Sequence, residues 1–351
     1  MAIKSRTGID VEIWIEFRVK SGIGTGIEND IEMAIKSRTG IEVEIWIEFR
    51  VKSGIGTGIE NDIEMAIKSR TGIEVEIWIE FRVKSGIGTE IENDIEMAIK
   101  SRTGIEVEIW IEFRVKSGIG TGIENDIEMA IKSRTGIEVE IWIDFRVKSG
   151  IGTGIENDIE MAIKSRTGID VEIWIEFRVK SGIGTGIEND IEIAIKSRTG
   201  IEVEIWIEFR VKSGIGTGIE NDIEMAIKSR TGIDVEIWIE FRVKSGIGTG
   251  IENDIEIAIK SRTGIEVEIW IEFRVKSGIG TGIENDIEMA IKSRTGIDVE
   301  IWIEFIVKSG IGTEIENDIE IAIKKSNRDR SRNLDRVQSQ ERDRYRNRER
   351  Y

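Results

Sequence analysis

The chain has 351 residues, of which 67 are acidic and 50 basic, so its formal net charge at pH 7 is −17. It contains no cysteine, no histidine and no proline. Without cysteine and histidine, the sequence excludes disulfides, thiol nucleophiles, histidine-based catalytic triads and zinc sites of the usual ligand types. Without proline, glycine is the strongest remaining turn signal.

The first 320 residues are ten copies of one 32-residue unit, and an eleventh copy begins at Ile321. A fixed period outweighs length as a guide to architecture, so we expect one β-repeat array over 1–323 and a basic low-complexity tail over 324–351. Met1 is the first residue of a repeat, equivalent to Met33, and we expect the reading frame to start inside the array without a leader. No run approaches the roughly 18 apolar residues of a membrane helix, so we predict no helical membrane span.

Each repeat alternates between apolar and polar residues. Ile9, Ile13 and Phe17 stand at odd positions, whereas the even positions are mostly charged or glycine. Because 32 is even, this alternation keeps its phase from copy to copy, so we expect Ile9, Ile13 and Phe17 to point inward and Trp14 to point outward in every coil. Alternation with many β-branched residues predicts two strands per unit, over Ile9–Ser21 and Ile27–Arg38. Gly8 and the cluster from Gly22 to Gly26 are the turn signals between them.

Two strand orders fit this pattern, and the charges favour the antiparallel one. A hairpin centred on Gly24 places Lys20 opposite Glu28 and Arg18 opposite Asp30. Each such pair contributes roughly 0.2 to 1 kcal/mol. A parallel solenoid with one 32-residue coil per turn instead stacks like charges on each other, at a similar cost that salt screens.

Burial favours the solenoid, and burial is the larger effect. The repeat has about eleven apolar side chains at odd positions, and each contributes roughly 1.5 to 3 kcal/mol when buried. A coil folded back on itself closes a core in every repeat, whereas an open sheet seldom exceeds about ten strands. We therefore predict an all-β tandem-repeat β-solenoid of ten 32-residue units. The alternative is an antiparallel β-meander sandwich or barrel with the same strands.

Trp14 is the one large aromatic residue on the polar face, between Glu12 and Glu16. In a solenoid its equivalents form a surface ladder, which could stack sugar rings or an aromatic partner. We expect instead that the indole rings stack on one another. These weak candidates are Trp14, Trp46, Trp78, Trp110, Trp142, Trp174, Trp206, Trp238, Trp270 and Trp302.

Other constellations predict no catalytic, cofactor or metal site. The run Glu28-Asn29-Asp30 beside Gly26 faintly resembles the calcium-binding repeat of β-rolls, but it lacks the nine-residue period and the glycine pair, so we interpret it as a solvated acidic face. A catalytic site repeated ten times is improbable, and a uniform surface predicts no concave pocket, so we expect no enzyme. The acidic array should not bind nucleic acid. Flat, isoleucine-rich strands make self-association or aggregation the one partner interaction to expect.

The tail has eleven basic and five acidic residues from Lys324 onward, and it reads as the repeat in another reading frame. One extra A in the Lys324 codon turns Ile-Lys-Ser-Arg-Thr-Gly into Ile-Lys-Lys-Ser-Asn-Arg, as the chain has it. Every residue from Lys325 to Tyr351 then fits a shifted reading of SRTGIEVEIWIEFRVKSGIGTGIENDI, and a stop codon follows if the last Ile is ATT. We therefore interpret the tail as frameshifted and predict that it is disordered.

The ten copies are nearly identical. They differ at five repeat positions. The first position has Ile193 and Ile257 in place of Met; the tenth has either Glu or Asp, with Asp10, Asp170, Asp234 and Asp298; and single copies carry Asp144 in place of Glu and Ile306 in place of Arg. The fifth variable position has Glu90 and Glu314 in place of Gly. Each change is reachable by one base, and solvent-facing positions are as uniform as core ones. The sequence thus predicts a translated 96-nucleotide minisatellite with no evolved biochemical function. The alternative is a structural or adhesive β-repeat protein that acts through an extended surface.

Overall fold

The computed structural model describes residues 2–20, 26–52, 55–84, 87–116, 119–148, 151–180, 183–212, 215–244, 247–276, 279–308 and 311–325. The predicted array lies almost entirely within these ranges. Of the predicted tail only Lys324 and Lys325 are described, and they end the last strand. The predicted disorder is therefore wrong for Lys324 and Lys325, which pair with Lys292 and Ser293 of the preceding coil. Residues 326–351 lie outside the described part, so the prediction for them stays a prediction.

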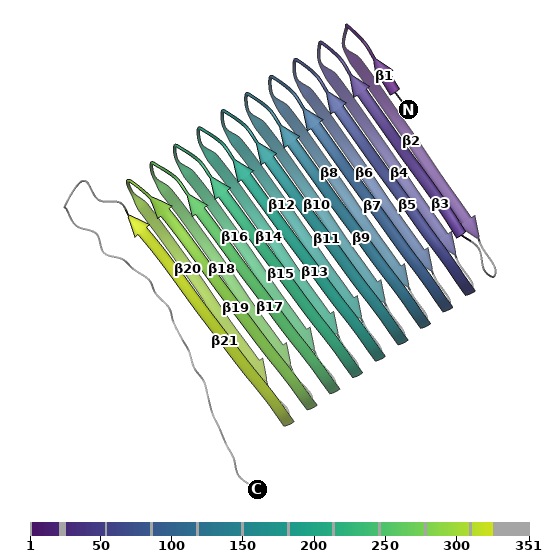
Figure 1. Ribbon diagram of the computed structural model, residues 1–351, viewed down its shortest axis with the longest axis vertical. Helices are drawn as coiled ribbons and strands as arrows, with labels where there is room; N and C mark the ends of the chain where they lie inside the picture. The colour runs from purple at the N-terminus through teal and green to yellow at the C-terminus, as the bar shows by residue number, and fades with distance from the viewer. Residues whose placement is uncertain are drawn as a thin grey trace.

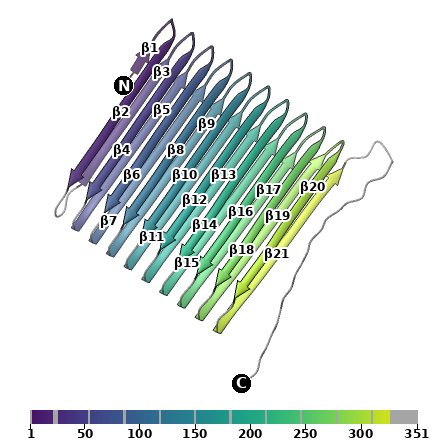
Figure 2. The same cartoon turned by 180° about the vertical axis from the view of Figure 1, so that it is seen from behind.

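The strands form two parallel sheets (Figures 1 and 2). The 10-stranded sheet contains β2 (Ile9–Lys20), β4 (Ile41–Lys52), β6 (Ile73–Lys84), β8 (Ile105–Lys116), β10 (Ile137–Lys148), β12 (Ile169–Lys180), β14 (Ile201–Lys212), β16 (Ile233–Lys244), β18 (Ile265–Lys276) and β20 (Ile297–Lys308). The 11-stranded sheet contains β1 (Ala2–Lys4), β3 (Gly26–Lys36), β5 (Ile55–Lys68), β7 (Ile87–Lys100), β9 (Ile119–Lys132), β11 (Ile151–Lys164), β13 (Ile183–Lys196), β15 (Ile215–Lys228), β17 (Ile247–Lys260), β19 (Ile279–Ser293) and β21 (Ile311–Lys325). The chain passes from one sheet to the other and back in each repeat.

Each strand pairs in register with the strand one repeat further on, as Ile137 with Ile169 and Trp142 with Trp174. The protein is thus an all-β solenoid of about nine turns with 32-residue repeats, close to the predicted ten units. The alternative antiparallel meander or barrel is wrong, because every pairing among the described strands is parallel. Burial of the apolar rows outweighs the repulsion between stacked like charges, which lie on the solvent side.

The core lies between the two sheets, and the predicted alternation decides which side chains enter it. Ile45 and Phe49 of β4 are fully buried, and they share one apolar cluster with Met65 and Ile67 of the facing sheet. The buried phenylalanines form a stack, with ring centroids of Phe145 and Phe177 4.8 Å apart. Even positions point outward, so the prediction of inward Ile and Phe rows and an outward Trp row is confirmed.

The turns differ from the predicted ones in extent. β3 ends at Lys36 rather than Arg38, because Ser37 leaves the strand and its hydroxyl donates a hydrogen bond of 2.9 Å to the carbonyl of Thr7 in the previous coil. On the other side, β5 starts at Ile55, so most of the glycine cluster belongs to a strand. In β7, one coil further on, Gly88 has φ of 60°, a left-handed conformation that only glycine adopts without strain.

Candidate functional site

The tryptophan ladder lies on the outer face of the 10-stranded sheet. Each ring stacks on the ring of the next coil, as Trp142 on Trp174 with centroids 4.8 Å apart and planes inclined by 2°. The last pair, Trp270 and Trp302, is slightly looser at 5.2 Å and 10°. The structure thus brings all ten sequence-predicted residues into one row, and the expectation that they stack on one another is confirmed.

Stacking decides what the ladder can bind. An interior ring has an indole neighbour on both faces, so its edge alone is open to solvent. Trp14 at the N-terminal end is 75% exposed, compared with 39% for Trp78 in the interior. A sugar ring that needs an indole face would find it at this end of the row, whereas the interior offers a continuous stripe of ring edges.

Charged rows flank the ladder on the same face. On one side, Glu48 and Arg50 of β4 form an ion pair two residues apart. The equivalent pair, Arg146 and Asp144, lies at 2.5 Å, and its hydrogen bond raises the pKa of Arg146. These pairs neutralise one edge of the ladder, and because they are partly exposed each contributes little to stability.

On the other side of the ladder, the acidic row that contains Glu44 has no ion pair of this kind within the part of the chain that the structure describes. Desolvation raises the pKa of Glu44, and the stacked carboxylates of Glu12 and Glu76 raise it further. The second sheet has a comparable row, in which burial and then Asp94 and Asp158 raise the pKa of Asp126. Parallel in-register pairing produces these rows, because it places every carboxylate next to its own copy.

The structure contains a ladder of buried asparagines that the sequence analysis did not predict. Asn157 is 2% exposed, and its side-chain amide donates a 2.7 Å hydrogen bond to the Asn189 side-chain oxygen of the next coil. The same bond links Asn61 to Asn93 and all equivalent pairs up to Asn285 and Asn317. The sequence signal for this ladder is the odd, inward position of Asn29. The interpretation of Glu28-Asn29-Asp30 as a solvated acidic face is therefore wrong for Asn29, whose side chain bonds to Asn61.

The asparagine ladder is structural rather than ligating. Its amides satisfy each other, while the acidic neighbours on either side point outward. Among the described residues, no group of three or more Asp and Glu side chains is arranged to hold a metal ion. The described part of the chain also contains no helix that is long and apolar enough to cross a membrane.

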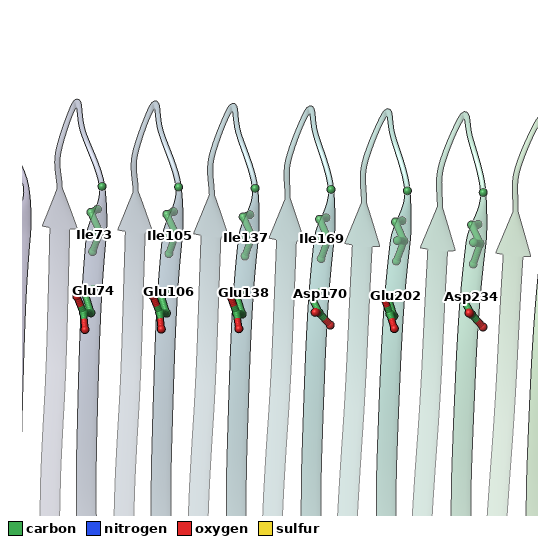
Figure 3. Close-up of a pocket in the computed structure, with 18 of the residues that line it drawn as sticks. Ile73, Glu74, Ile105, Glu106, Ile137, Glu138, Ile169, Asp170, Glu202 and Asp234 are labelled. Atoms are coloured by element: carbon green, nitrogen blue, oxygen red, sulfur yellow. The ribbon is translucent and has the colours of Figure 1, made fainter.

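Two grooves run along the array, so the prediction of a surface without concavity is wrong. The larger has a volume of 1490 Å³ and is lined by three rows, which begin at Gly8, Ile9 and Asp10 and end at Gly296, Ile297 and Asp298 (Figure 3). Glycine rows create it, because a missing side chain in every coil leaves a continuous trough. A second groove of 960 Å³ follows the rows of Gly122, Ile123 and Glu124.

The grooves have an apolar floor and an acidic rim, repeated in each coil. Figure 3 shows Glu74, Glu106 and Glu138 in the same orientation along the larger groove. Ile105 beneath this rim is 3% exposed, so the floor belongs to the core. Such a surface offers no single enclosed point at which two different reactive groups converge.

Comparison with known proteins gives no relative from which a function could be transferred. No protein-family model matches the chain, and neither a curated protein nor a solved structure matches it.

Proposed function

We propose that the chain is the translation product of a duplicated 96-nucleotide unit and has no evolved biochemical activity. The single observation that carries this proposal is the tail, whose 27 residues from Lys325 to Tyr351 fit the repeat read in another frame. A selected basic segment has no reason to preserve such a relation. The near identity of the ten copies supports the same origin.

The nucleotide sequence of the gene tests this proposal. We expect one additional base in the run of A at the Lys324 codon, relative to the equivalent codons of Lys292 and Lys260. We also expect synonymous differences among the copies to be no more frequent than replacements. A normal codon at Lys324, or a clear excess of synonymous differences, would contradict it.

We infer a second candidate, a structural or adhesive repeat protein, from where the variable positions lie. Four of the five variable repeat positions face outward in the fold, including those of Asp144 and Ile306, so the solvent-facing positions are less uniform than the core ones, contrary to the sequence-based interpretation. The fifth position faces inward and holds Met225 in one copy and Ile257 in another. Selection for a stable core produces this distribution, since cores tolerate swaps of similar volume. The extended stripe of tryptophan edges would be the working surface.

An adsorption assay addresses this second candidate. The full chain should bind an insoluble polysaccharide or matrix protein, and exchanging Trp142 and Trp174 for Ser should reduce binding at least severalfold. The matched control exchanges Glu140 and Glu172, which lie beside them on the same face, for Gln. Equal binding by both variants would show that the ladder is not the adhesive surface.

A further inference from the structure

We propose that the two ends of the array bind each other, so that copies of this chain join head to tail into a linear filament. The proposal rests on the geometry of the end coils and on neither candidate function. Figure 1 places β1 and β21 at opposite ends of the array. Each end carries residues that are buried in every interior coil.

The C-terminal end presents the core to solvent. Ile319 of β21 is 40% exposed, whereas Ile287, one coil earlier at the same repeat position, is 0% exposed. Phe305 of β20 is half-buried, although Phe273 beneath it is fully buried. Within the described residues, no strand pairs with the outer edge of either β20 or β21.

The N-terminal end has the complementary gap. β1 has three residues and covers β3 only at Ala34, Ile35 and Lys36, so the rest of the outer edge of β3 has no partner strand among the described residues. On its inner edge, by contrast, β3 pairs with β5 along its whole length, from Gly26 to Lys36. The 15-residue strand β21 has the length and the sequence to fill this gap.

The register of the joint follows from the internal register. If β2 of a second copy continues the sheet after β20, then β3 of that copy continues the sheet after β21. Glu314 then pairs with Gly26, and Lys324 pairs with Lys36, as each residue pairs with its equivalent inside the array. In the joint, Ala322–Lys324 of the first copy take the place of β1 in the second copy. The three residues of that β1, Ala2–Lys4, must therefore leave the edge of β3.

The polar groups at the two ends are also complementary. Inside the array each asparagine amide donates to the next side-chain oxygen, and Asn317 accepts from Asn285 at the C-terminal end. In the joint the side-chain amide of Asn317 would donate to the side-chain oxygen of Asn29, which inside its own copy donates to Asn61. The donor direction makes the contact head to tail.

Stacking and the backbone continue in the same way. Phe305 would stack on Phe17, as their equivalents do inside the array. The backbone N–H of Ile265 donates to the carbonyl of Gly296, so the N–H of Ile297 would donate to Gly8 of the second copy. Because such a heterologous contact does not close on itself, it produces an open filament.

Sedimentation velocity of the full chain tests association. With a net charge of −17 on each copy, joints should form more readily at an ionic strength of about 0.15 M than at low salt. We expect the mean sedimentation coefficient to rise with protein concentration and to fall again on dilution. A monomer at every concentration and salt overturns the proposal.

The exchange Asn317→Asp tests the asparagine contact. The carboxylate still accepts from Asn285 but can no longer donate to Asn29, so we expect the association constant to fall about tenfold or more. The matched control is Gly282→Glu, which adds the same charge on the outer face at a position where other copies carry Glu90 and Glu314. Equal weakening by both variants overturns the contact.

The exchange Ile3→Gly acts in the opposite direction. It weakens the pairing of β1, which competes with Ala322–Lys324 for the same edge of β3. We expect stronger association, with the strand signal of the monomer in circular dichroism unchanged within error. Unchanged or weaker association overturns this register.

Engineered cysteines test the joint directly, because the natural chain has none. A Glu12→Cys variant mixed with a Glu300→Cys variant should form a disulfide-linked dimer, since adjacent parallel strands are about 4.8 Å apart and disulfides span that distance. The control replaces Glu300→Cys by Glu268→Cys, one coil further inside. Equal cross-linking in both mixtures overturns the proposed geometry.

Discussion

Phe177 in the middle of the array and Phe17 at its N-terminal end occupy the same repeat position, yet Phe177 is 1% exposed and Phe17 is half-buried. The two coils, residues 1–32 and 161–192, are identical in sequence. They differ only in the number of neighbouring coils. A central coil has a coil on each side, whereas the first coil has one. In this fold, burial, stacking and hydrogen bonding are therefore properties of the contact between coils, as expected for a solenoid.

The largest expected effect comes from a charge in a central coil. Ile173→Glu buries an unpaired carboxylate and should cost on the order of 4 kcal/mol or more. Ile13→Glu should cost less, because the carboxylate can reach solvent at the open end. Since contacts are between neighbours, circular dichroism should show loss of part of the strand signal; complete loss would contradict the nearest-neighbour description.

Removing an aromatic ring should have the next largest effect. Phe177→Ala deletes a ring stacked on both sides and should lower the free energy of unfolding by about 3 to 5 kcal/mol. Phe17→Ala should cost less than that, because Phe17 is only half-buried and, among the described residues, stacks on Phe49 alone. Urea denaturation measures both, and equal losses would show that the two positions are not energetically different.

The asparagine ladder allows a finer comparison. Asn157→Ala leaves the amide of Asn125 without an acceptor and the oxygen of Asn189 without a donor, at about 1 to 3 kcal/mol for each. Asn29→Ala leaves only the oxygen of Asn61, so about half the cost is expected. Glu156→Ala, on the outer face, is the control and should change stability by less than about 0.5 kcal/mol.

The smallest effect concerns pH. Burial, and then the carboxylates of neighbouring coils, raise the pKa of Asp126 and Asp158, so the folded chain holds these protons more tightly than the unfolded chain. Their stabilising contribution is present below the ordinary carboxyl pKa of about 4 and is lost as pH rises through the raised folded values. The free energy of unfolding should therefore increase as pH is lowered from 7 into that window.

Asp126→Asn should weaken this pH dependence, because it removes one titrating group whose pKa is raised in the folded chain. The measurement is chemical denaturation at low protein concentration, since the isoelectric point near 4.8 favours precipitation. A free energy of unfolding that falls steadily from pH 7 toward pH 4 would show that other carboxylates determine the pH dependence.

Much of this fold could be predicted from the repeat. Alternation identified the inward rows of Ile13 and Phe17 and the outward row of Trp14, because side chains of a strand point to opposite faces in turn. The ladder of stacked tryptophans followed once a parallel coil was assumed. What the pattern could not give was the extent of the second strand, since the glycines after Gly54 fit either a turn or a strand.

The missed features depend on neighbours in space. Asn29 stands in the inward phase, but a single repeat contains no partner for its amide; the partner is Asn61, one coil away. The groove along Gly8 and its equivalents likewise exists only after ten glycines have been aligned. Both features arise from in-register pairing.

The sequence by itself determined the strands, the faces of the strands and the 32-residue period, because each depends on residue type and on even spacing. Only the tertiary structure decided that the strands are parallel. The charge pattern allowed an antiparallel hairpin with Lys20 opposite Glu28, and the coil instead stacks Glu28 on Glu60. The parallel order prevails because closing a core in every repeat buries far more apolar surface than exposed ion pairs can offset.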